Sequence, residues 1–337
     1  MRMHRLKQSI SATYHVISRV IERRFIFGDL EKGYLLNLMR RLETFSGCKV
    51  LTYVFMDNHF HILLHVPERI ELDDNEVKRR AASLYGDEKY ARMEKNWELW
   101  SDRGREDLVK EQLDGFRTRM YDLSEFMKTF KQRISIYYNA NHNRHGAGPL
   151  WHGRFKSLLI DSQQYTQLPV AAYIDLNPVR AGIVNDPKDY RWSGYAEALG
   201  EVGQALEGIS HLFADNTLTE KEVLAQYRQR LYCEGAQKIN ELTGEVTRPG
   251  FDRQAIDKVL EEGGELSVAQ LLHCKISCFS DGVVLGSKAF VERMLNEHSD
   301  QFSALRRQRG ACEIKHGQLC GLCTVGELRS TKMSSSA

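Results

Sequence analysis

Two short apolar segments separated by a polar turn constrain the fold of this chain more than any other feature. Residues 49–56 and 60–66 are rich in β-branched and aromatic side chains, and the turn pair Asp57-Asn58 lies between them, so the sequence predicts a β-hairpin. Residues 9–20 have the composition of a further strand. Residues 30–45 place apolar side chains at helical spacing. The chain is therefore predicted to begin as β-α-β-β.

The same alternation of strand and helix continues after residue 120. One helix face is formed by Leu123, Phe126, Met127, Phe130, Ile134, Tyr137 and Tyr138. Residues 155–160 predict a strand, and residues 165–176 predict a helix that Asn177-Pro178 should stop. Pro169 should kink or start that helix. The predicted fold class is α+β, a ferredoxin-like split β-α-β sandwich with one more helix packed on it.

Two further regions differ in texture from this unit. Residues 68–115 are highly charged and Gly-punctuated, which predicts helical pieces in a solvated insertion within a domain spanning residues 1–200. Residues 201–328 predict a second, mostly helical accessory region, and residues 329–337 a disordered tail.

Within the accessory region, helices are expected at residues 220–232, 255–261 and 267–273. Ser267 and Ser287 are each placed to cap a helix, but the link at residues 278–286 is longer than a helix-turn-helix normally uses. A DNA-reading pair of helices and a packing domain both remain open.

Composition limits the classes of protein that the chain can represent. Lys and Arg number 47 against 45 Asp and Glu, so a case for nucleic acid must come from local clusters. No apolar run approaches the roughly 20 residues that cross a bilayer, and residues 1–12 lack a following apolar segment, so a cytoplasmic protein without membrane contact is expected. No glycine-rich phosphate-binding loop is evident, so no nucleotide requirement is expected.

The cysteines argue against a disulfide framework. The chain has 7, an odd number, and five of them lie in its last fifth. A zinc site could draw on Cys274, Cys278, Cys312, His316, Cys320 and Cys323. Only one close pair exists, however, and the spacing fits no standard zinc finger, so buried thiols are the default interpretation.

The most specific local signal is His59-Phe60-His61. In a strand the two imidazoles point to one side and Phe60 to the other, so the pair could clamp a divalent ion. The alternative is that His59 belongs to the turn and His61 is an ordinary surface histidine. His65 shares the same parity but lies about 13 Å further along a strand, which favours a structural role.

A second signal lies in the helix before Asn177-Pro178. Tyr173 and Asn177 are four residues apart, so they share a helix face and present a phenol beside an amide. A phenol with a pKa near 10 is a weak nucleophile, but attack on a metal-polarised phosphodiester is feasible. The alternative is that Tyr173 only packs.

The third signal is a stretch without acid. Residues 126–160 contain no Asp or Glu, while aromatic side chains that include Trp151 are interspersed among cations. The cations are Lys128, Lys131, Arg133, Arg144, Arg154 and Lys156. Cations with interleaved aromatics predict phosphate contacts and base stacking on a single strand, although a solvated loop is the alternative.

Taken together, five segments resemble a known family. They are residues 14–16, residues 54–61, residues 148–157, residues 173–182 and the closing residues 190–195. In this order they are similar to the REP-associated tyrosine transposases, relatives of the single-tyrosine HUH insertion-sequence transposases. The resemblance covers roughly residues 5 to 200, and Trp192 and Tyr195 within it are expected to be core residues.

This resemblance implies a metal-dependent endonuclease and strand transferase acting on single-stranded DNA with hairpins. It implies that His59 and His61 bind Mg²⁺ or Mn²⁺, that Asn177 completes the metal site, and that Tyr173 forms a 5′-phosphotyrosine. Tyr137 and Tyr138 are competing tyrosines, but neither has a ligand-type residue at the i+4 position. The block at residues 148–157 is expected to grip DNA, with Arg154 and Lys156 on phosphates and Trp151 either stacking on a base or packing.

Other interpretations stay open at this stage. A domesticated hairpin-binding protein would use the same basic surface without cleavage, and a metal hydrolase using activated water would need no covalent intermediate. Relatives occur as monomers and as homodimers, and the insertion and the accessory region could select the hairpin.

Overall fold

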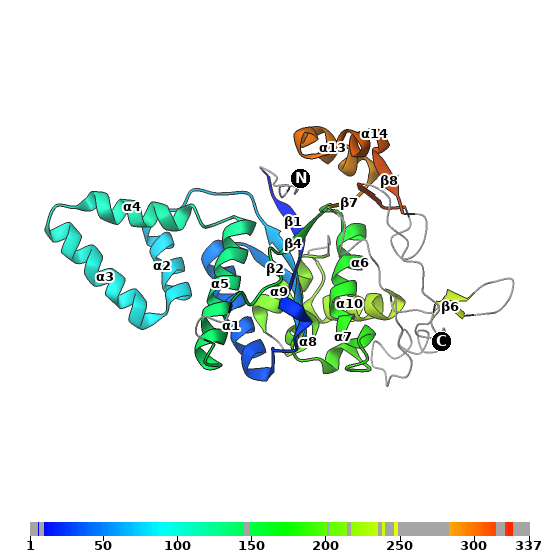
Figure 1. Ribbon diagram of the computed structural model, residues 1–337, viewed down its shortest axis with the longest axis horizontal. Helices are drawn as coiled ribbons and strands as arrows, with labels where there is room; N and C mark the ends of the chain where they lie inside the picture. The colour runs from blue at the N-terminus through cyan, green and yellow to red at the C-terminus, as the bar shows by residue number, and fades with distance from the viewer. Residues whose placement is uncertain are drawn as a thin grey trace.

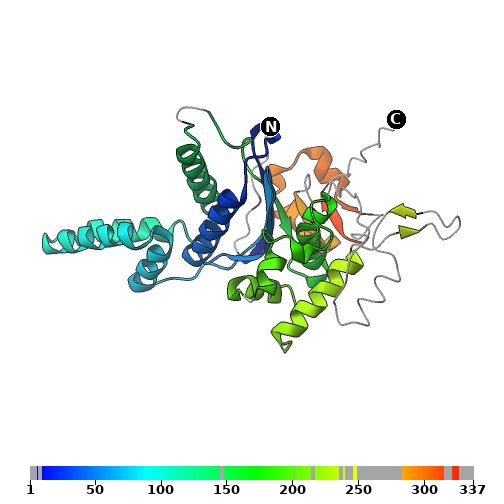
Figure 2. The same ribbon diagram turned by 90° about the horizontal axis from the view of Figure 1, so that it is seen from below.

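The computed structural model describes residues 6, 10–144, 148–200, 202–213, 217–234, 238–239, 246–248, 283–314 and 321–325. Its centre is a sheet with helices on both faces, from which a helical arm projects on one side (Figures 1 and 2).

The first four strands form the predicted ferredoxin-like unit. They are β1 (Ala12–Arg19), β2 (Lys49–Phe55), β3 (His59–Val66) and β4 (Lys156–Ile160). Their order is β2-β3-β1-β4, and each neighbouring pair is antiparallel. This is the strand order of a split β-α-β sandwich, so the predicted α+β fold class is confirmed.

Helices cover both faces of this sheet. The helices α1 (Asp29–Ser46) and α5 (Leu123–Asn141) contact each other, and α6 (Gln164–Asp175) contacts β2 and β3. Phe60 and His61 point to opposite faces of β3; Phe60 contacts Phe130 of α5, whereas His61 contacts Tyr173 of α6. The α1–α5 layer and α6 therefore lie on opposite sides of the sheet.

The charged insertion is helical, as predicted. It contains α2 (Asp74–Tyr85), α3 (Asp87–Asp102) and α4 (Glu106–Arg117). α2 packs on α1, and α3 and α4 extend away from the sheet as a two-helix arm (Figure 1). Trp97 donates a hydrogen bond to Gln112 across these two helices at 2.5 Å. The buried residues of the arm, among them Trp97 and Leu113, belong to the same hydrophobic core as the sheet.

The predicted helix at residues 165–176 is confirmed, because α6 ends at Asp175, just before Asn177-Pro178. A second short helix that was not predicted, α7 (Asn177–Arg180), follows after Leu176, which is itself in the α-helical region. Pro178 lies in the first turn of α7, where its missing N–H costs nothing. Residues 173–180 therefore lie on two consecutive helices, the end of α6 and the whole of α7.

The region after residue 200 packs on the same core. The helix α8 (Gly194–Leu199) contacts α9 (Gly203–Ser210), α9 packs on β2, and α10 (Glu220–Glu234) packs on α6. Gly208 lies so close to the sheet that a Cβ there would meet the Val50 carbonyl oxygen at 2.2 Å.

The accessory region also extends the sheet, which the sequence did not predict. β7 (Val284–Gly286) pairs in parallel with β4, followed by β9 (Cys323–Val325) and β8 (Ala311–Glu313). Helices α13 (Lys288–Glu297) and α14 (Ala304–Arg309) accompany these strands, and β5 (Lys238–Ile239) pairs with β6 (Val246–Arg248) separately. Three 3₁₀ turns complete the described elements: η1 (Ile21–Arg23), η2 (Pro187–Asp189) and η3 (Ser299–Gln301). Strands of two or three residues are too short to show the alternation of apolar and polar residues from which a strand is predicted.

Several predictions concern residues outside the described ranges. These are the helices at residues 255–261 and 267–273 with the Ser267 cap, the tail at residues 329–337, and Cys274, Cys278, Cys320 and His316 of the possible zinc site. The Ser287 cap is confirmed, because its hydroxyl accepts from the Phe290 N–H of α13. In the part of the chain that can be described, no helix is long and apolar enough to cross a membrane.

Candidate functional site

The two histidines of the triplet lie side by side on the α6 face of the sheet. His59 is the first residue of β3 and not part of the turn, so alternation along the strand places it on the same face as His61. Their ring centroids are 5.1 Å apart. His61 is buried, whereas His59 is partly exposed, so the pair opens to solvent at the His59 end.

A third histidine, which the sequence analysis did not place in the site, supports this pair. In the β1–β3 register Ile17 lies opposite His61, which brings His15 onto the same face. The His15 ring stacks on the His61 ring at 5.1 Å, and His15 Nε2 lies 2.9 Å from His61 Nδ1. The strand parity of β1 relative to β3 could have indicated His15, but the register is not visible in the sequence.

Burial keeps these imidazoles neutral. Desolvation, with a smaller contribution from Arg19, lowers the pKa of His59 to about 4, and desolvation lowers the pKa of His61 well below its ordinary value. His59 Nδ1 lies 2.6 Å from the Asn58 side-chain oxygen, so that nitrogen carries the proton. His59 and His61 thus each engage Nδ1 with a neighbour, and their Nε2 atoms are the nitrogens available to a ligand.

Tyr173 of α6 lies directly against the histidines. Its ring meets His61 edge-on at 5.9 Å and His15 at 6.1 Å between centroids. The Arg180 guanidinium lies 4.6 Å from the centre of the Tyr173 ring and donates to the Tyr173 carbonyl oxygen at 2.9 Å. The Tyr173 ring therefore contacts the buried imidazoles of His15 and His61 as well as the positive charge of Arg180.

Asn177 is anchored to the same turn. Its side-chain nitrogen donates to the carbonyl oxygens of Tyr173 and Ile174 at 3.0 and 3.4 Å. This orientation commits the amide nitrogen to the helix and leaves the amide oxygen as the atom with ligand chemistry.

The competing tyrosines lie on the other side of the sheet, in α5. Tyr137 stacks on Tyr34 at 3.8 Å, and the buried Tyr138 stacks on His142 at 4.2 Å. Among the three candidate tyrosines, Tyr173 is the one that the structure places beside the histidine pair.

Trp151 takes the packing alternative of the two that the sequence offered. Its side chain is 8% exposed, contacts Phe27 and Phe60, and donates from Nε1 to Ser135 at 2.9 Å. A buried indole with its donor satisfied has no free face for a base, so the expectation of stacking by Trp151 is corrected. Trp192 and Tyr195 are buried as expected.

The predicted cations divide into supporting and exposed groups. Arg133 donates to the Leu84 carbonyl oxygen at 2.9 Å and supports the insertion, which is a structural role. Lys131 donates to the Gly153 carbonyl oxygen at 2.8 Å and so fixes the segment that follows Trp151. Lys128 is exposed and pairs with Glu125 at 3.1 Å.

Three cations remain near the segment that precedes β4. Arg144 lies 5.6 Å from the Tyr138 ring centre and is partly exposed. Arg154 and Lys156 are both exposed, and Lys156 lies opposite Ile17 at the same end of the sheet as His59. The contact of Arg154 and Lys156 with DNA stays a prediction. Their exposure, and the place of Lys156 at the His59 end of the sheet, are consistent with it.

A buried carboxylate behind Tyr173 was not singled out by the sequence. Asp175 accepts from Thr52 Oγ1 at 2.8 Å, from the Tyr227 hydroxyl at 2.5 Å and from the Tyr195 N–H at 3.2 Å. Burial raises its pKa to about 7, although these three donors oppose the shift. Asp175 therefore joins α6 to β2 and α10 and fixes the helix that carries Tyr173.

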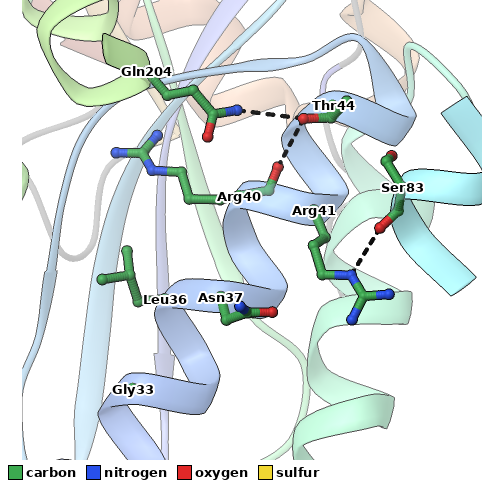
Figure 3. Close-up of a pocket in the computed structure, with 8 residues that line it drawn as sticks. All are labelled: Gly33, Leu36, Asn37, Arg40, Arg41, Thr44, Ser83 and Gln204. Atoms are coloured by element: carbon green, nitrogen blue, oxygen red, sulfur yellow. Dashed lines mark hydrogen bonds between the residues drawn. The ribbon is translucent and has the colours of Figure 1, made fainter. Parts of the chain in front are cut away.

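A surface cavity of about 450 Å³ lies elsewhere, along α1 (Figure 3). Its two guanidinium groups are already committed: Arg40 pairs with Glu43 at 2.6 Å and Glu197 at 2.5 Å, and Arg41 donates to the Ser83 carbonyl oxygen at 2.7 Å. The cavity therefore offers little free charge to an anion.

The remaining metal-site candidates are weaker. Within the described ranges, no group of three or more His, Cys, Asp or Glu side chains could hold an ion. Cys312 and Cys323 lie on the neighbouring strands β8 and β9, but their paired residues are Thr324 and Glu313. His65 contacts Thr13 Oγ1 at 3.1 Å, in keeping with a structural role.

Fold and site together define an α+β protein of the split β-α-β type, with His59 and His61 on its central strand β3 and Tyr173 in contact with His61. Residues 8–104 match the family described as "Transposase IS200 like", so this stretch of the chain is similar to those transposases. The match contains His59 and His61 and ends before Tyr173.

Comparison with other proteins adds little beyond the family. No curated protein matches the chain. A solved structure described as the REP-associated tyrosine transposase bound to a REP hairpin has 14% sequence identity, covers 65% of this chain and 94% of its own, and gives a TM-score of 0.37.

Proposed function

We propose that this transposase-family protein is a metal-dependent endonuclease and strand transferase for single-stranded, hairpin-containing DNA, with Tyr173 as the nucleophile. The observation that carries the proposal is the contact of the Tyr173 ring with His61 at 5.9 Å, because these residues come from distant parts of the chain and meet only in the fold. A histidine pair serves no purpose in hairpin binding alone, whereas it does serve phosphodiester cleavage.

The donors present fit a divalent ion. His59 and His61 are neutral and keep their Nε2 atoms available, and the Asn177 side-chain nitrogen is bound to backbone carbonyl oxygens, so its oxygen could serve as the third ligand. Two imidazoles and one amide oxygen would leave positions open for phosphate oxygens, as Mg²⁺ or Mn²⁺ requires. When bound, the ion would act as a Lewis acid that polarises the scissile phosphate.

The chain's own residues would then perform the covalent step. The Tyr173 oxygen attacks phosphorus, the bond from phosphorus to the 3′-oxygen breaks, and the 3′-oxygen leaves with a proton as a hydroxyl. The product is a 5′-phosphotyrosine, and attack by a 3′-hydroxyl reverses the step without an external energy source. Arg180 holds the Tyr173 backbone and places a positive charge beside its ring, which favours an approaching phosphate.

His15 has a positioning role in this arrangement. Its contact with His61 Nδ1 at 2.9 Å fixes the orientation of the ring that presents Nε2. Partners of this kind orient metal-ligating histidines and raise their basicity.

The test is incubation of the full chain with end-labelled hairpin DNA from the flanks of its own gene, with Mn²⁺ or with EDTA, followed by a denaturing gel. A metal-dependent covalent adduct is expected for the wild type and for Tyr137→Phe, the matched control from α5, and not for Tyr173→Phe. An adduct that survives in Tyr173→Phe would refute the assignment of the nucleophile.

The same reactions, with binding followed in parallel on a native gel, separate the two alternative functions. Cleavage without an adduct would indicate a hydrolase that uses activated water. Tight binding without cleavage, on DNA shown to be the true target, would indicate a domesticated hairpin-binding protein.

A further inference from the structure

We propose that the loop at residues 19–25, here named the basic loop, is a contact site for single-stranded DNA, in which Phe25 stacks on a base and the arginines contact phosphates. This inference rests on the proposed function, since it places the substrate strand at the histidine site. It assigns the stacking role to an aromatic residue that the sequence analysis did not consider.

The basic loop is fastened to the histidine site. Arg19 at the end of β1 lies opposite His59 in the β1–β3 register. The Asn58 side chain donates to the Arg23 carbonyl oxygen at 3.0 Å, and the N–H groups of Ile26 and Phe27 both donate to the Asp57 carbonyl oxygen at 2.9 Å. The turn that precedes His59 is therefore hydrogen-bonded to the C-terminal part of the loop and to the residues that follow it.

The other flank of the loop adjoins the segment that carries Arg154. The Ile21 N–H donates to the Leu150 carbonyl oxygen at 3.0 Å, and the His152 N–H donates to the Arg19 carbonyl oxygen at 2.9 Å. A strand that reaches His59 at this end of the sheet thus passes between two cationic segments.

The side chains of the loop have the chemistry of a single-strand contact. Phe25 is 80% exposed, the highest value for a large hydrophobic side chain in the described part of the protein. Arg19, Arg23 and Arg24 are exposed, and no described residue forms a hydrogen bond or ion pair with their guanidinium groups. Three arginines and one acid, Glu22, leave the loop positive, and cations beside an open aromatic face suit phosphates and a base.

The backbone of the loop is strained at two consecutive residues. Glu22 and Arg23 have φ values of 56° and 55°, a region that residues with a side chain rarely adopt. Such strain persists where surrounding contacts impose it and is concentrated at functional sites. Here the contact is the Asn58 side chain, one residue before the first histidine.

The experiment measures binding of the full chain to a fluorescein-labelled oligo-dT of about 20 nucleotides by anisotropy in EDTA, so that no cleavage occurs. Phe25→Ala should weaken binding about 5- to 150-fold, the range for loss of one base–aromatic stack. The matched control Ile70→Ala removes another exposed apolar side chain, 57% exposed and outside the loop, and should bind as the wild type does. Replacing the bases by abasic sites should abolish the difference between Phe25→Ala and wild type.

Salt dependence tests the arginines. Each phosphate that a protein neutralises on a single strand contributes about 0.7 to the slope of log K against log salt. Arg23→Ala/Arg24→Ala should therefore reduce the magnitude of that slope by about 1.4. The control Lys95→Ala/Arg103→Ala removes two exposed cations of the α3 region and should leave the slope unchanged.

The outcomes separate this inference from the proposed function. If the wild type binds but the loop variants match their controls, the basic loop is not the contact site, while the nuclease proposal stands. An equal loss in the loop and α3 double variants would indicate diffuse electrostatic attraction and would also overturn the inference. If the wild type binds neither oligo-dT nor hairpin DNA, both proposals fail.

Discussion

Replacing Asp175 by asparagine should stabilise the protein at alkaline pH and not at acidic pH. The carboxyl is fully buried between α6, β2 and α10, and burial raises its pKa from 3.8 to about 7. The folded state therefore retains a proton that the unfolded state has already lost between about pH 4 and pH 7. Stability contributed by this group falls as the pH rises through that window.

The size of the effect follows from the two pKa values. At about 1.4 kcal/mol for each pH unit, the distance from 3.8 to about 7 corresponds to about 4 kcal/mol of destabilisation above pH 7. Asparagine can satisfy the same partners, with its oxygen accepting from the Tyr195 N–H and its amide donating to the hydroxyl oxygens of Thr52 and Tyr227. Asp175→Asn should therefore gain up to about 4 kcal/mol at pH 8 and nothing near pH 4.

The assay is urea unfolding followed by far-UV circular dichroism from pH 4.5 to 8.5, with the difference between variant and wild type plotted against pH. Taking the difference removes the opposite contribution of His59 and His65, whose pKa values are lowered to about 4 and which therefore destabilise the fold as the pH falls below 6.5. Tyr227→Phe removes a donor that lowers the pKa, so it should extend the window to higher pH. A difference that is independent of pH, or a loss of stability in Asp175→Asn at pH 8, would refute the reasoning.

Three other perturbations have defined outcomes. Trp151→Ala should lower the free energy of unfolding by about 3 to 5 kcal/mol in chemical denaturation, as for other buried aromatic side chains. Trp151→Phe should bind DNA like the wild type. Weaker DNA binding by a stable Trp151→Phe would restore the stacking role. Mn²⁺ at 100 times its Kd should stabilise the fold by about 2.7 kcal/mol, and His59→Ala/His61→Ala should abolish that gain in a thermal melt; an unchanged gain would place the ion elsewhere. Gly208→Ala should destabilise the fold strongly, because the added Cβ would clash with the backbone of β2. Gly115→Ala, in an open helical position, should raise the free energy of unfolding by about 0.5 to 1 kcal/mol. Equal unfolding midpoints for the two variants would contradict the close packing of Gly208 on the sheet.

Much of the ferredoxin-like unit was predictable because its elements are long and strongly periodic. The predicted hairpin at residues 49–66 appears as β2 and β3, and Gly47 ends α1 in the left-handed conformation with φ of 71°. The strands β7, β8 and β9 were missed because each has three residues and gains its hydrogen bonds only from distant partners. Helix α7 was missed because a proline is compatible with both the end and the start of a helix.

The candidate site was only partly predictable. Periodicity placed His59 and His61 on one side of a strand, and spacing placed Asn177 one turn after Tyr173. Neither pattern says which face of the sheet a helix will cover, so the approach of Tyr173 to His61 could not follow from spacing. Trp151 illustrates the opposite case, since its cationic neighbours suggested a stacking role while its own side chain is buried among Phe27 and Phe60.

The sequence by itself determined the order of the elements, the shared face of His59 and His61, and the match of residues 8–104 to a transposase family, because period and local motif depend only on neighbours along the chain. The tertiary structure alone decided that His15 meets His61, that Tyr173 and not Tyr137 contacts His61, and that Phe25 is exposed in the loop after β1. These outcomes depend on strand register, on the side of the sheet that each helix covers and on competition for burial. Long-range packing sets all three.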